Sequence, residues 1–463
     1  MLPLHHTKVP DAASVEAVNQ TAGVKLDIDW VPNDIYTDRI RNAIETNSLR
    51  MVTSVTQPDY ESYGKNAIRS GIFWEIGPYL SSYPNLRNLD KQILNDIAVD
   101  GKIYGLYTQR PSSRQGVILR KDWLDKLNEK EPASIDELYH IMKRFTTGDP
   151  DGNGANDTIG LADRKDLMYG AFKTLSSYFG TPNNWSVSGG KLVPEFMSPE
   201  YMDTMNFMKK LYNEGVVNPD FAVTSKQIQR YMFISGKAGI YIGALTDAPR
   251  LLDEMKKLNP KAELTLVNRI KGPKGYGVWS IPRYSSVLLF SKKTIPTEED
   301  LKNVLAFFDR TLDADVANLL AYGQPGKAYV EKSGKAVLKP EMADYKNTEV
   351  FPFLPLMINN LNNPNLLPID EASLTPLTVM ADKLVADNEN ILIVDPAQHL
   401  ASPTNETRGS ELSQFIANAT YDYILGHIDG SGFAEAIATW RSRGGDKIIE
   451  EYNEAYRSAG AKS

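Results

Sequence analysis

The segment Ser134-Ile-Asp-Glu-Leu-Tyr-His-Ile-Met-Lys-Arg-Phe145 has the pattern of a capped amphipathic helix. Ser134 followed three residues later by Glu137 is a capping box, in which the two side chains satisfy backbone N–H groups of the first turn. Apolar residues then recur at helical spacing and share one face, namely Leu138, Ile141, Met142 and Phe145. The sequence therefore predicts an amphipathic helix with one buried face.

Strand-like segments occur on both sides of this helix. Between Val24 and Val31 apolar and polar residues alternate strictly, which is typical of a half-buried strand, and a helix is expected just before it over 12–22. We expect further strands at Met51–Val55, Ile103–Tyr107, Val117–Arg120, Ala238–Gly243, Ala262–Asn268 and Ser285–Phe290.

Two more helices have recognisable starts. Ser198-Pro199 opens a helix whose buried face would be Met205, Met208 and Tyr212. Thr297, followed by three acidic residues, opens another, whose buried face would be Leu301, Val304, Leu305, Phe308 and Leu312. Strands separated by helices of this length indicate an α/β fold.

The composition of the chain excludes several classes of protein. Its 463 residues, 42% of them hydrophobic, are enough for two or three domains. The absence of cysteine excludes disulfides, thiol catalysis and cysteine-based zinc sites. A net charge of −7 without a basic run argues against nucleic acid as a partner. No apolar run reaches the roughly 18 residues of a membrane span, and we expect any export signal to lie outside this sequence.

The loop Asp149-Pro-Asp-Gly-Asn-Gly-Ala-Asn-Asp-Thr-Ile-Gly160 follows the helix that begins at Ser134 and resembles an EF-hand calcium loop. Oxygen-bearing side chains fall at loop positions 1, 3, 5 and 9, and Gly154 at position 6 permits the sharp turn. A flexible cage made only of protein oxygens favours Ca²⁺ over Mg²⁺. We expect the ion to have a structural role. The expected ligands are Asp149, Asp151, Asn153, Ala155 through its carbonyl, Asp157 and Thr158.

The twelfth position of this loop departs from the EF-hand pattern. It carries Gly160 instead of the bidentate Glu. The last ligand is then a water molecule, the Thr158 hydroxyl or a carboxylate just downstream such as Asp163. The alternative is a polar turn without a metal, since Asp, Pro, Gly and Asn are ordinary turn residues.

Short segments along nearly the whole chain resemble one known family. They are Asp100-Gly-Lys-Ile-Tyr-Gly105, Leu119-Arg-Lys-Asp-Trp-Leu124 with Pro132-Ala-Ser-Ile-Asp-Glu137, Lys210-Leu-Tyr-Asn-Glu-Gly215 with Asn218-Pro-Asp220, Ser235-Gly-Lys-Ala-Gly239, Tyr322-Gly-Gln-Pro-Gly-Lys-Ala-Tyr329 and Glu450-Glu-Tyr-Asn-Glu-Ala-Tyr456. Their order resembles that of the extracellular solute-binding proteins of carbohydrate ABC importers, above all the large lipoprotein-type members of Gram-positive bacteria. The chain differs at Ser48-Leu-Arg-Met-Val52, where members usually carry a Pro-Asp pair.

The resemblance implies a two-lobed α/β fold, periplasmic-binding-protein-like and of the class II type, with a ligand cleft between the lobes. Residues 1–115 and 286–335 would form the N-terminal lobe. Residues 116–285 and 336–463 would form the C-terminal lobe, which carries the calcium loop 149–160. Hinged closure of such lobes couples ligand capture to recognition by a permease.

The resemblance also implies a function and a location. The protein would bind an extracellular oligosaccharide and deliver it to the transmembrane permease of an ABC importer, without catalysis. It would be a monomeric cell-surface lipoprotein of a Gram-positive bacterium. Its only link to the membrane would be a lipid anchor on a cysteine that this chain does not contain.

A sugar pocket needs aromatic rings that stack on C–H faces and planar polar groups that hold pairs of hydroxyls. We expect such residues on loops that end strands near the lobe crossings. The candidates are Gln57, Asp59, Gln109, Arg110, Trp185, Tyr241 and Trp279. Arg110 and Arg114 are either surface charges or, facing the cleft, partners for an acidic sugar such as a uronate. Trp30, Trp74 and Trp123 fall within strand or helix patterns and are expected in the core.

Two other functions remain open at this point. A glycoside hydrolase or polysaccharide lyase would share the sugar-facing chemistry, although acidic pairs alone are no evidence among 58 acidic residues. No GxSxG, Walker or GxGxxG motif supports an enzyme. A calcium-stiffened adhesion module would normally show internal repeats and all-β spacing, which the sequence lacks.

Overall fold

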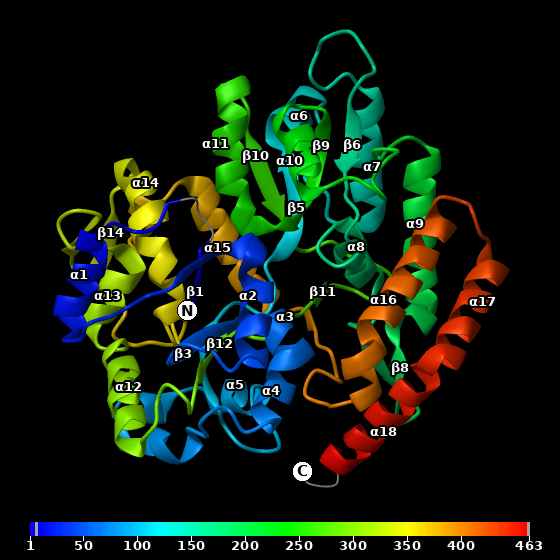
Figure 1. Ribbon diagram of the computed structural model, residues 1–463. Coiled ribbons are helices and arrows are strands. Elements are labelled where there is room, and N and C mark those ends of the chain that lie inside the picture. The colour runs from blue at the N-terminus through cyan, green and yellow to red at the C-terminus, as the bar shows by residue number, and fades with distance from the viewer. Residues whose placement is uncertain (5–7, 461–463) are drawn as a thin grey trace. The chain divides into compact units, whose positions relative to one another are not determined.

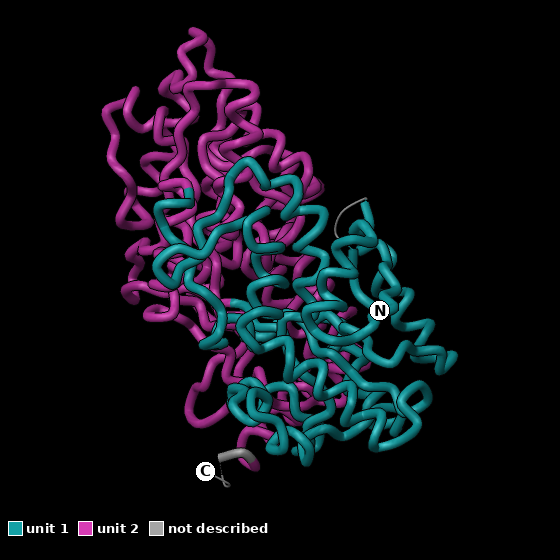
Figure 2. The backbone as a smooth tube through the Cα atoms, turned by 90° about the vertical axis from the view of Figure 1, so that its left-hand side faces the viewer, with its two compact units in different colours: residues 1–110, 282–374 teal, residues 111–281, 375–463 magenta. Residues whose placement is uncertain are grey.

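The computed structural model describes residues 1–4 and 8–460 of the chain. The polypeptide folds into two compact units, which Figure 2 colours separately. Unit 1 comprises 1–110 and 282–374, and unit 2 comprises 111–281 and 375–463. Each unit is therefore assembled from two separate segments of the sequence, and the chain passes between the units three times.

Unit 1 is built on a three-stranded antiparallel sheet in the order β3-β12-β4 (Figure 1). The central strand β12 (Tyr284–Phe290) pairs with β3 (Val52–Thr56) on one side and β4 (Gly105–Gln109) on the other. Both outer strands run antiparallel to β12, so they are parallel to each other and end at the same edge of the sheet. The sequence predicted all three strands to within two residues at each end.

Helices enclose this sheet and bury a continuous apolar core that includes Tyr36, Ile40, Val55, Leu106, Val287 and Phe290. The α-helices of unit 1 are α1 (Ala12–Ala22), α2 (Asn33–Glu45), α3 (Gln57–Asp59), α4 (Lys65–Arg69), α5 (Lys91–Asp96), α12 (Glu298–Arg310), α13 (Ala314–Tyr322) and α14 (Ala343–Tyr345). Its other strands are the parallel pair β1 (Leu2–Leu4) and β2 (Trp30–Pro32) and the hairpin β13 (Tyr329–Lys332) with β14 (Lys335–Leu338). The predicted cap of α12 is confirmed, because Thr297 Oγ1 accepts a hydrogen bond from the Asp300 N–H at 3.1 Å.

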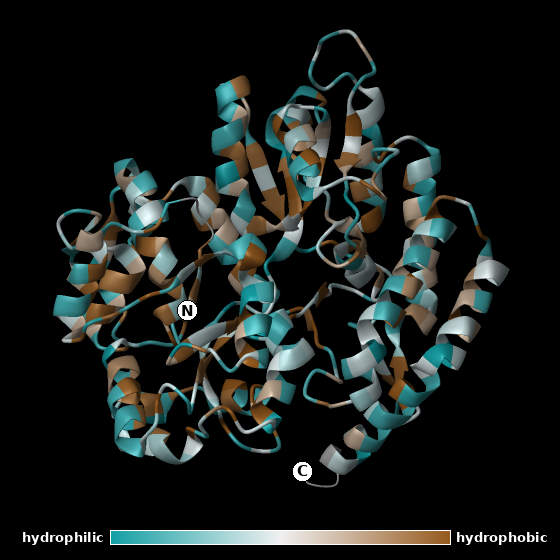
Figure 3. Ribbon diagram, viewed as in Figure 1, coloured by the Kyte–Doolittle hydropathy of each residue, from teal (hydrophilic) through white to brown (hydrophobic). Residues whose placement is uncertain are grey.

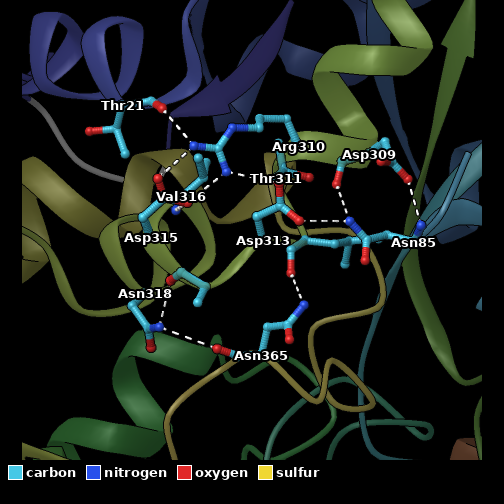
Figure 4. Close-up of polar contacts among 12 residues, drawn as sticks. Thr21, Asn85, Asp309, Arg310, Thr311, Asp313, Asp315, Val316, Asn318 and Asn365 are labelled. Carbon is cyan, nitrogen blue, oxygen red and sulfur yellow. Dashed lines mark hydrogen bonds and ion pairs between the residues drawn. The ribbon is translucent and has the colours of Figure 1, made fainter.

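A polar network joins α1, α12 and α13 at the surface of unit 1 (Figure 4). The Arg310 guanidinium donates to Asp315 through both terminal nitrogens, at 2.7 and 2.5 Å, and to Asp313 at 2.8 Å. It also donates to the carbonyl of Thr21 at the end of α1, at 3.2 Å. One side chain thus ties α12 and the neighbouring α13 to α1, whose Thr21 lies 289 positions before Arg310.

Unit 2 is built on a four-stranded mixed sheet in the order β10-β5-β9-β6. The strands are β10 (Leu264–Val267), β5 (Gln115–Arg120), β9 (Ala238–Ala244) and β6 (Ile159–Ala162), with only the β6–β9 pair parallel. Figure 3 colours these strands largely as hydrophobic, in keeping with burial on both faces. Within β9, a Cβ on Gly239 would lie 2.2 Å from the Phe145 ring and 2.8 Å from the Trp123 ring, so only glycine fits there.

The predicted helix from Ser134 is confirmed as α7 (Ile135–Thr147). Ser134 Oγ accepts from the Glu137 N–H at 3.2 Å, and Glu137 accepts in return from the Ala133 N–H at 2.7 Å. The other α-helices of unit 2 are α6 (Lys121–Lys126), α8 (Ala171–Phe179), α9 (Pro199–Asn213), α10 (Lys226–Ile234), α11 (Ala248–Leu258), α15 (Pro376–Asn388), α16 (Pro403–Ile424), α17 (Gly430–Trp440) and α18 (Asp446–Gly460). Two short strand pairs complete the unit, the hairpin β7 (Trp185–Ser188) with β8 (Lys191–Pro194) and the parallel pair β11 (Val278–Trp279) with β15 (Leu392–Ile393).

The predicted strand at Val24–Val31 is largely wrong, because only Trp30–Pro32 forms a strand, β2. The preceding residues make no ladder, although Val24, Leu26 and Ile28 do pack against the core of unit 1. The alternating pattern therefore results from burial of one side of an extended segment, and it does not indicate that the segment pairs with a neighbouring strand.

The second segment of unit 1, 282–374, extends beyond the predicted second segment of the N-terminal lobe, 286–335. Residues 336–374, which the sequence assigned to the C-terminal lobe, fold with unit 1. The physical reason is local pairing and shared core: β14 pairs with β13, and Phe353, Leu356 and Ile358 are buried in the unit 1 core. In the part of the chain that the structure describes, no helix is both long and apolar enough to cross a membrane.

Candidate functional site

The loop expected to bind calcium connects α7 to β6 and lies at the surface of unit 2. Its backbone turns sharply, with left-handed φ values at Asp149, Gly152 and Gly154 of 47°, 77° and 82°. Glycine adopts such φ values without strain, and Asp tolerates them better than most residues. The turn that the sequence predicted from Gly154 is therefore present.

Within this loop the oxygen-bearing side chains face N–H groups of the loop itself. The Asp149 carboxylate accepts from the backbone N–H groups of Gly152 at 3.0 Å and Gly154 at 3.2 Å. The Asn153 amide donates to Asp151 at 2.8 Å and to Asp157 at 3.1 Å. Bonds from Asn153 and then Lys237 lower the pKa of Asp157.

The side chains of the loop fit calcium by type and order, since all are hard oxygen donors. Two carboxylates, of Asp151 and Asp157, converge on one Asn153 amide group. Within residues 1–4 and 8–460, however, no three His, Cys, Asp or Glu side chains gather closely enough to hold a metal ion. The loop therefore has the donor chemistry for a hard cation, with its carboxylates turned toward internal N–H donors.

The two side chains considered for the last ligand, those of Thr158 and Asp163, make hydrogen bonds to other parts of unit 2. The Thr158 hydroxyl is buried and donates to the carbonyl of Phe145 at 2.7 Å, so it is engaged by the end of α7. Asp163 is also buried and accepts from the N–H of Ala171 at 2.8 Å, and burial raises its pKa to about 6. Both side chains serve the packing of unit 2.

Four of the expected ligand-binding residues lie at one edge of the unit 1 sheet. Gln57 and Asp59 follow β3, whereas Gln109 ends β4 and Arg110 follows it, so the parallel course of these strands brings the two pairs to the same edge. The Arg110 guanidinium donates to Gln57 at 3.1 Å, and its Nε donates to the carbonyl of Pro282 at 2.9 Å. The structure thus unites residues that are 53 positions apart in the sequence.

Two of these four side chains are already engaged in holding the fold. The buried Asp59 carboxylate accepts from the hydroxyls of Thr37 at 2.9 Å and Thr56 at 2.8 Å. The buried Gln109 side chain accepts from the backbone N–H groups of Leu361 at 2.9 Å and Asn362 at 3.2 Å. Gln57 and Arg110 are only half-buried and are the better candidates for ligand contact.

The three aromatic candidates differ in their surroundings. Tyr241 and Trp279 are each 1% exposed. Trp279 donates to Thr174 Oγ1 at 3.0 Å and packs edge-on against Tyr169. Tyr241 packs against Phe233. These contacts identify both as core residues, although the sequence suggested them as ligand-binding candidates. Trp185 is half-buried and lines a cavity.

That cavity has a volume of about 690 Å³, and all of its lining residues belong to unit 2. They come from the segment after β6, from α8, the β7–β8 hairpin, α9, the segment before α16, and α16 to α18. Its polar residues include Lys173, Asn184, Glu195 and Asp395. Sequence reasoning missed these four, because they are scattered over 223 positions and share no motif.

Comparison with known proteins identifies the family. The family described as bacterial extracellular solute-binding protein matches residues 8–309, well over half of the chain. The chain belongs to this family. The polygalacturonan/rhamnogalacturonan-binding protein YtcQ of Bacillus subtilis is 43% identical to it, over 99% of this chain and 91% of YtcQ. Lipoprotein LipO of the same organism is 30% identical, over 99% of this chain and 92% of LipO.

Solved structures agree on the fold. The ABC-transporter substrate-binding protein FusA of Streptococcus pneumoniae, as an EF-hand mutant in complex with fructo-nystose, superposes with a TM-score of 0.71 at 15% identity. The match covers 100% of this chain and 99% of FusA. This solute-binding protein therefore has the two-domain α/β fold, periplasmic-binding-protein-like, that the sequence predicted.

Proposed function

We propose that this solute-binding protein captures a uronate-containing oligosaccharide outside the cell and delivers it to the permease of an ABC importer. The main support is its 43% identity to YtcQ, which extends along 99% of the chain and is not confined to one segment. YtcQ binds polygalacturonan and rhamnogalacturonan, whose galacturonate units each carry a carboxylate. A ligand of this class needs at least one cationic side chain that is free to pair with it.

Arg114 offers such a cation. It follows the point at which the chain passes from unit 1 to unit 2 and immediately precedes β5. Among the described residues its Nε is buried without a hydrogen-bond partner. Burying a guanidinium nitrogen without a partner is costly, and a ligand carboxylate would satisfy it. Arg110, by contrast, already donates to Gln57 and to the Pro282 carbonyl.

The proposal includes the setting in which the protein works. It acts by binding and release, without changing the bonds of the sugar, as expected for a family of binding proteins. A lipid anchor outside the present sequence would tether it, as a monomer, to the surface of a Gram-positive bacterium. Its similarity to a Bacillus lipoprotein supports this location.

Titration calorimetry with trigalacturonate and with neutral galactotriose tests the proposed ligand. Wild type should bind the acidic sugar, with an affinity that falls as salt rises. Arg114→Gln should weaken that binding about 10- to 100-fold, the value of a charge-assisted hydrogen bond. Arg250→Gln is the matched control, because Arg250 is an exposed residue of α11, and it should bind as wild type does. Equal binding of the neutral sugar would contradict the proposed ligand class, and release of new reducing ends would identify an enzyme instead.

We further propose that the loop 149–157 binds Ca²⁺ and thereby stabilises unit 2. The order of Asp149, Asp151, Asn153 and Asp157 around Gly154 supports this, as does the EF-hand that FusA carries. These four side chains and the Ala155 carbonyl would hold the ion, whose positive charge would replace the internal N–H donors. Water would supply the remaining ligands.

Thermal unfolding with and without Ca²⁺ tests this site. Binding only to the folded state should add about 2.7 kcal/mol at 100 times the dissociation constant. EDTA should therefore lower the melting temperature, and Ca²⁺ should restore it better than Mg²⁺ does. Asp151→Asn should abolish the response. Asp203→Asn, at an exposed position of α9, should retain it. A melting temperature that changes with neither EDTA nor Ca²⁺ would contradict the calcium site.

A further inference from the structure

The cavity of unit 2 has the size and lining of a ligand site. Its volume of about 690 Å³ lies within the range of about 300–1,000 Å³ that is typical of small-molecule sites. Two pairs of aromatic rings line it, Trp185 with Tyr452 and Phe196 with Trp440. In each pair the ring centroids are 4.9 Å apart and the rings meet edge to face. Because an edge-on partner covers only part of a ring, the half-buried Trp185 can still offer a face to a flat apolar ligand surface.

A fixed set of hydrogen-bonding groups lies beside these rings. Lys173 Nζ pairs with Glu195 at 2.5 Å and donates to Asn184 Oδ1 at 3.0 Å. The Asn184 amide in turn donates to Asp395 at 2.9 Å. Asn184 has a left-handed φ of 57°, a conformation that Asn tolerates better than most residues, and this backbone orients its amide. The result is a pre-positioned row of carboxylate and amide groups of the kind that holds sugar hydroxyls.

A buried hydroxyl of the lining has no partner among residues 1–4 and 8–460. Tyr421, on α16, is 8% exposed and lines the cavity. Its hydroxyl is buried and makes no hydrogen bond within the described part of the chain. Leaving a buried donor unsatisfied costs free energy, so a polar group of a ligand would be favoured there.

The charges of the lining disfavour an acidic sugar in this cavity. Its charged residues are Lys165, Asp166, Lys173, Glu195 and Asp395, three acidic against two basic. Lys173, moreover, is already paired with Glu195. A carboxylate would meet a net negative lining, whereas the hydroxyls of a neutral ring would meet acceptors and one free phenol.

We propose that the cavity formed by α8, the β7–β8 hairpin, α16 and α18 binds a neutral sugar ring of the oligosaccharide, with Trp185 stacking on its C–H face and Tyr421 bonding a hydroxyl. This inference rests on the proposed function, because it assigns one ring of that ligand. If the cavity holds a neutral ring, the protein should prefer a ligand in which neutral and acidic rings alternate over one made of uronates alone.

Titration calorimetry of three variants with two tetrasaccharides tests the proposal. One probe is a rhamnogalacturonan tetrasaccharide, in which neutral rhamnose alternates with galacturonate, and the other is tetragalacturonate. Tyr421→Phe should weaken binding of the first about 2- to 10-fold and leave the second unchanged. Trp185→Ala should weaken the first about 10-fold. Tyr423→Phe is the control on the same helix, because its hydroxyl donates to Asn206 at 2.6 Å and does not line the cavity.

Melting temperatures separate a ligand role from a structural one. Tyr421→Phe removes a hydroxyl without a partner, so its melting temperature should equal or exceed that of wild type, whereas Tyr423→Phe should melt lower without losing affinity. If wild type binds neither sugar, the proposed function itself fails. Suppose instead that wild type binds, and that both cavity variants either bind as tightly as wild type or lose affinity for both sugars to the same extent. The assignment of a neutral ring to this cavity is then overturned, while the proposed function stands.

Discussion

The ion pair between Arg269 and Asp387 gives a sharp test of how the C-terminal segment joins unit 2. Asp387, near the end of α15, accepts from Arg269 Nε at 2.7 Å and Nη2 at 2.8 Å, a bidentate pair. Its Oδ2 also accepts from the Asn268 amide at 2.9 Å. Residues 268 and 269 follow β10, so this contact fastens the returning chain to the sheet of unit 2. We expect Asp387→Asn to loosen that attachment.

The size of the effect follows from the contacts and their exposure. A hydrogen bond to a charged group contributes about 1.5–3 kcal/mol. The Arg269 and Asp387 side chains are 40% and 31% exposed, and solvent screening reduces the gain from such a pair. We therefore expect Asp387→Asn to lower the free energy of unfolding by about 1–2 kcal/mol. For a unit of this size that corresponds to a drop in melting temperature of about 2–8 °C.

The pH dependence provides the decisive measurement. Bonds from Arg269 and then Asn268 lower the pKa of Asp387 well below its usual value of 3.8. The folded protein therefore binds this proton more weakly than the unfolded chain, and the stabilisation is fully present above about pH 4–5. It is lost as the pH falls further, toward the pKa of the folded state. In calorimetry, the stability gap between wild type and Asp387→Asn should be constant from pH 7 to 5 and should narrow below pH 4.

The test needs a control substitution, and two outcomes would refute the reasoning behind it. Asp253→Asn, at an exposed position of α11, should melt as wild type does at every pH. An equal stability of Asp387→Asn and wild type at pH 7, or a gap that stays unchanged down to pH 3, would refute the reasoning.

Two further substitutions test the packing of each unit. Gly239→Ala should lower the free energy of unfolding by about 1–3 kcal/mol in denaturant titration, because its Cβ would lie 2.2 Å from the Phe145 ring; a neutral effect would show that this ring can move aside. Arg310→Gln should cost about 1 kcal/mol by the same measurement, since it removes the pairs with Asp313 and Asp315 in Figure 4. That loss should shrink in high salt, and a loss independent of salt would contradict an electrostatic cause.

Local sequence signals were sufficient for most individual elements. The capping box at Ser134 and the spacing of Leu138, Ile141 and Phe145 predicted α7, because helix caps and helical periodicity act over only a few residues. The same reasoning failed at Val24–Val31, where alternation arose from one-sided burial. A strand needs a partner, and the partner of this segment, β1, pairs only with Trp30–Pro32.

The candidate site was less predictable than the fold. Gln109 has a side chain of the type that binds sugar hydroxyls. Its oxygen, however, already accepts hydrogen bonds from the N–H groups of Leu361 and Asn362, about 250 positions away. Lys173, Asn184 and Asp395 carry no motif, and the structure alone brings them together. A residue type shows which bonds a side chain can make, whereas its tertiary neighbours decide which of those bonds are still available.

The sequence by itself determined the α/β class, the helix caps, the turn at Gly154 and the kinship with solute-binding proteins, because each of these depends on residue order and short-range contacts. Only the tertiary structure decided that residues 336–374 fold with unit 1 and that Trp279 is core while Trp185 lines a cavity. It also decided that Arg114 and Tyr421 keep buried polar atoms without partners among the described residues. These outcomes depend on hydrogen bonds and packing between segments far apart in the chain, and such pairings leave no local trace in the order of residues.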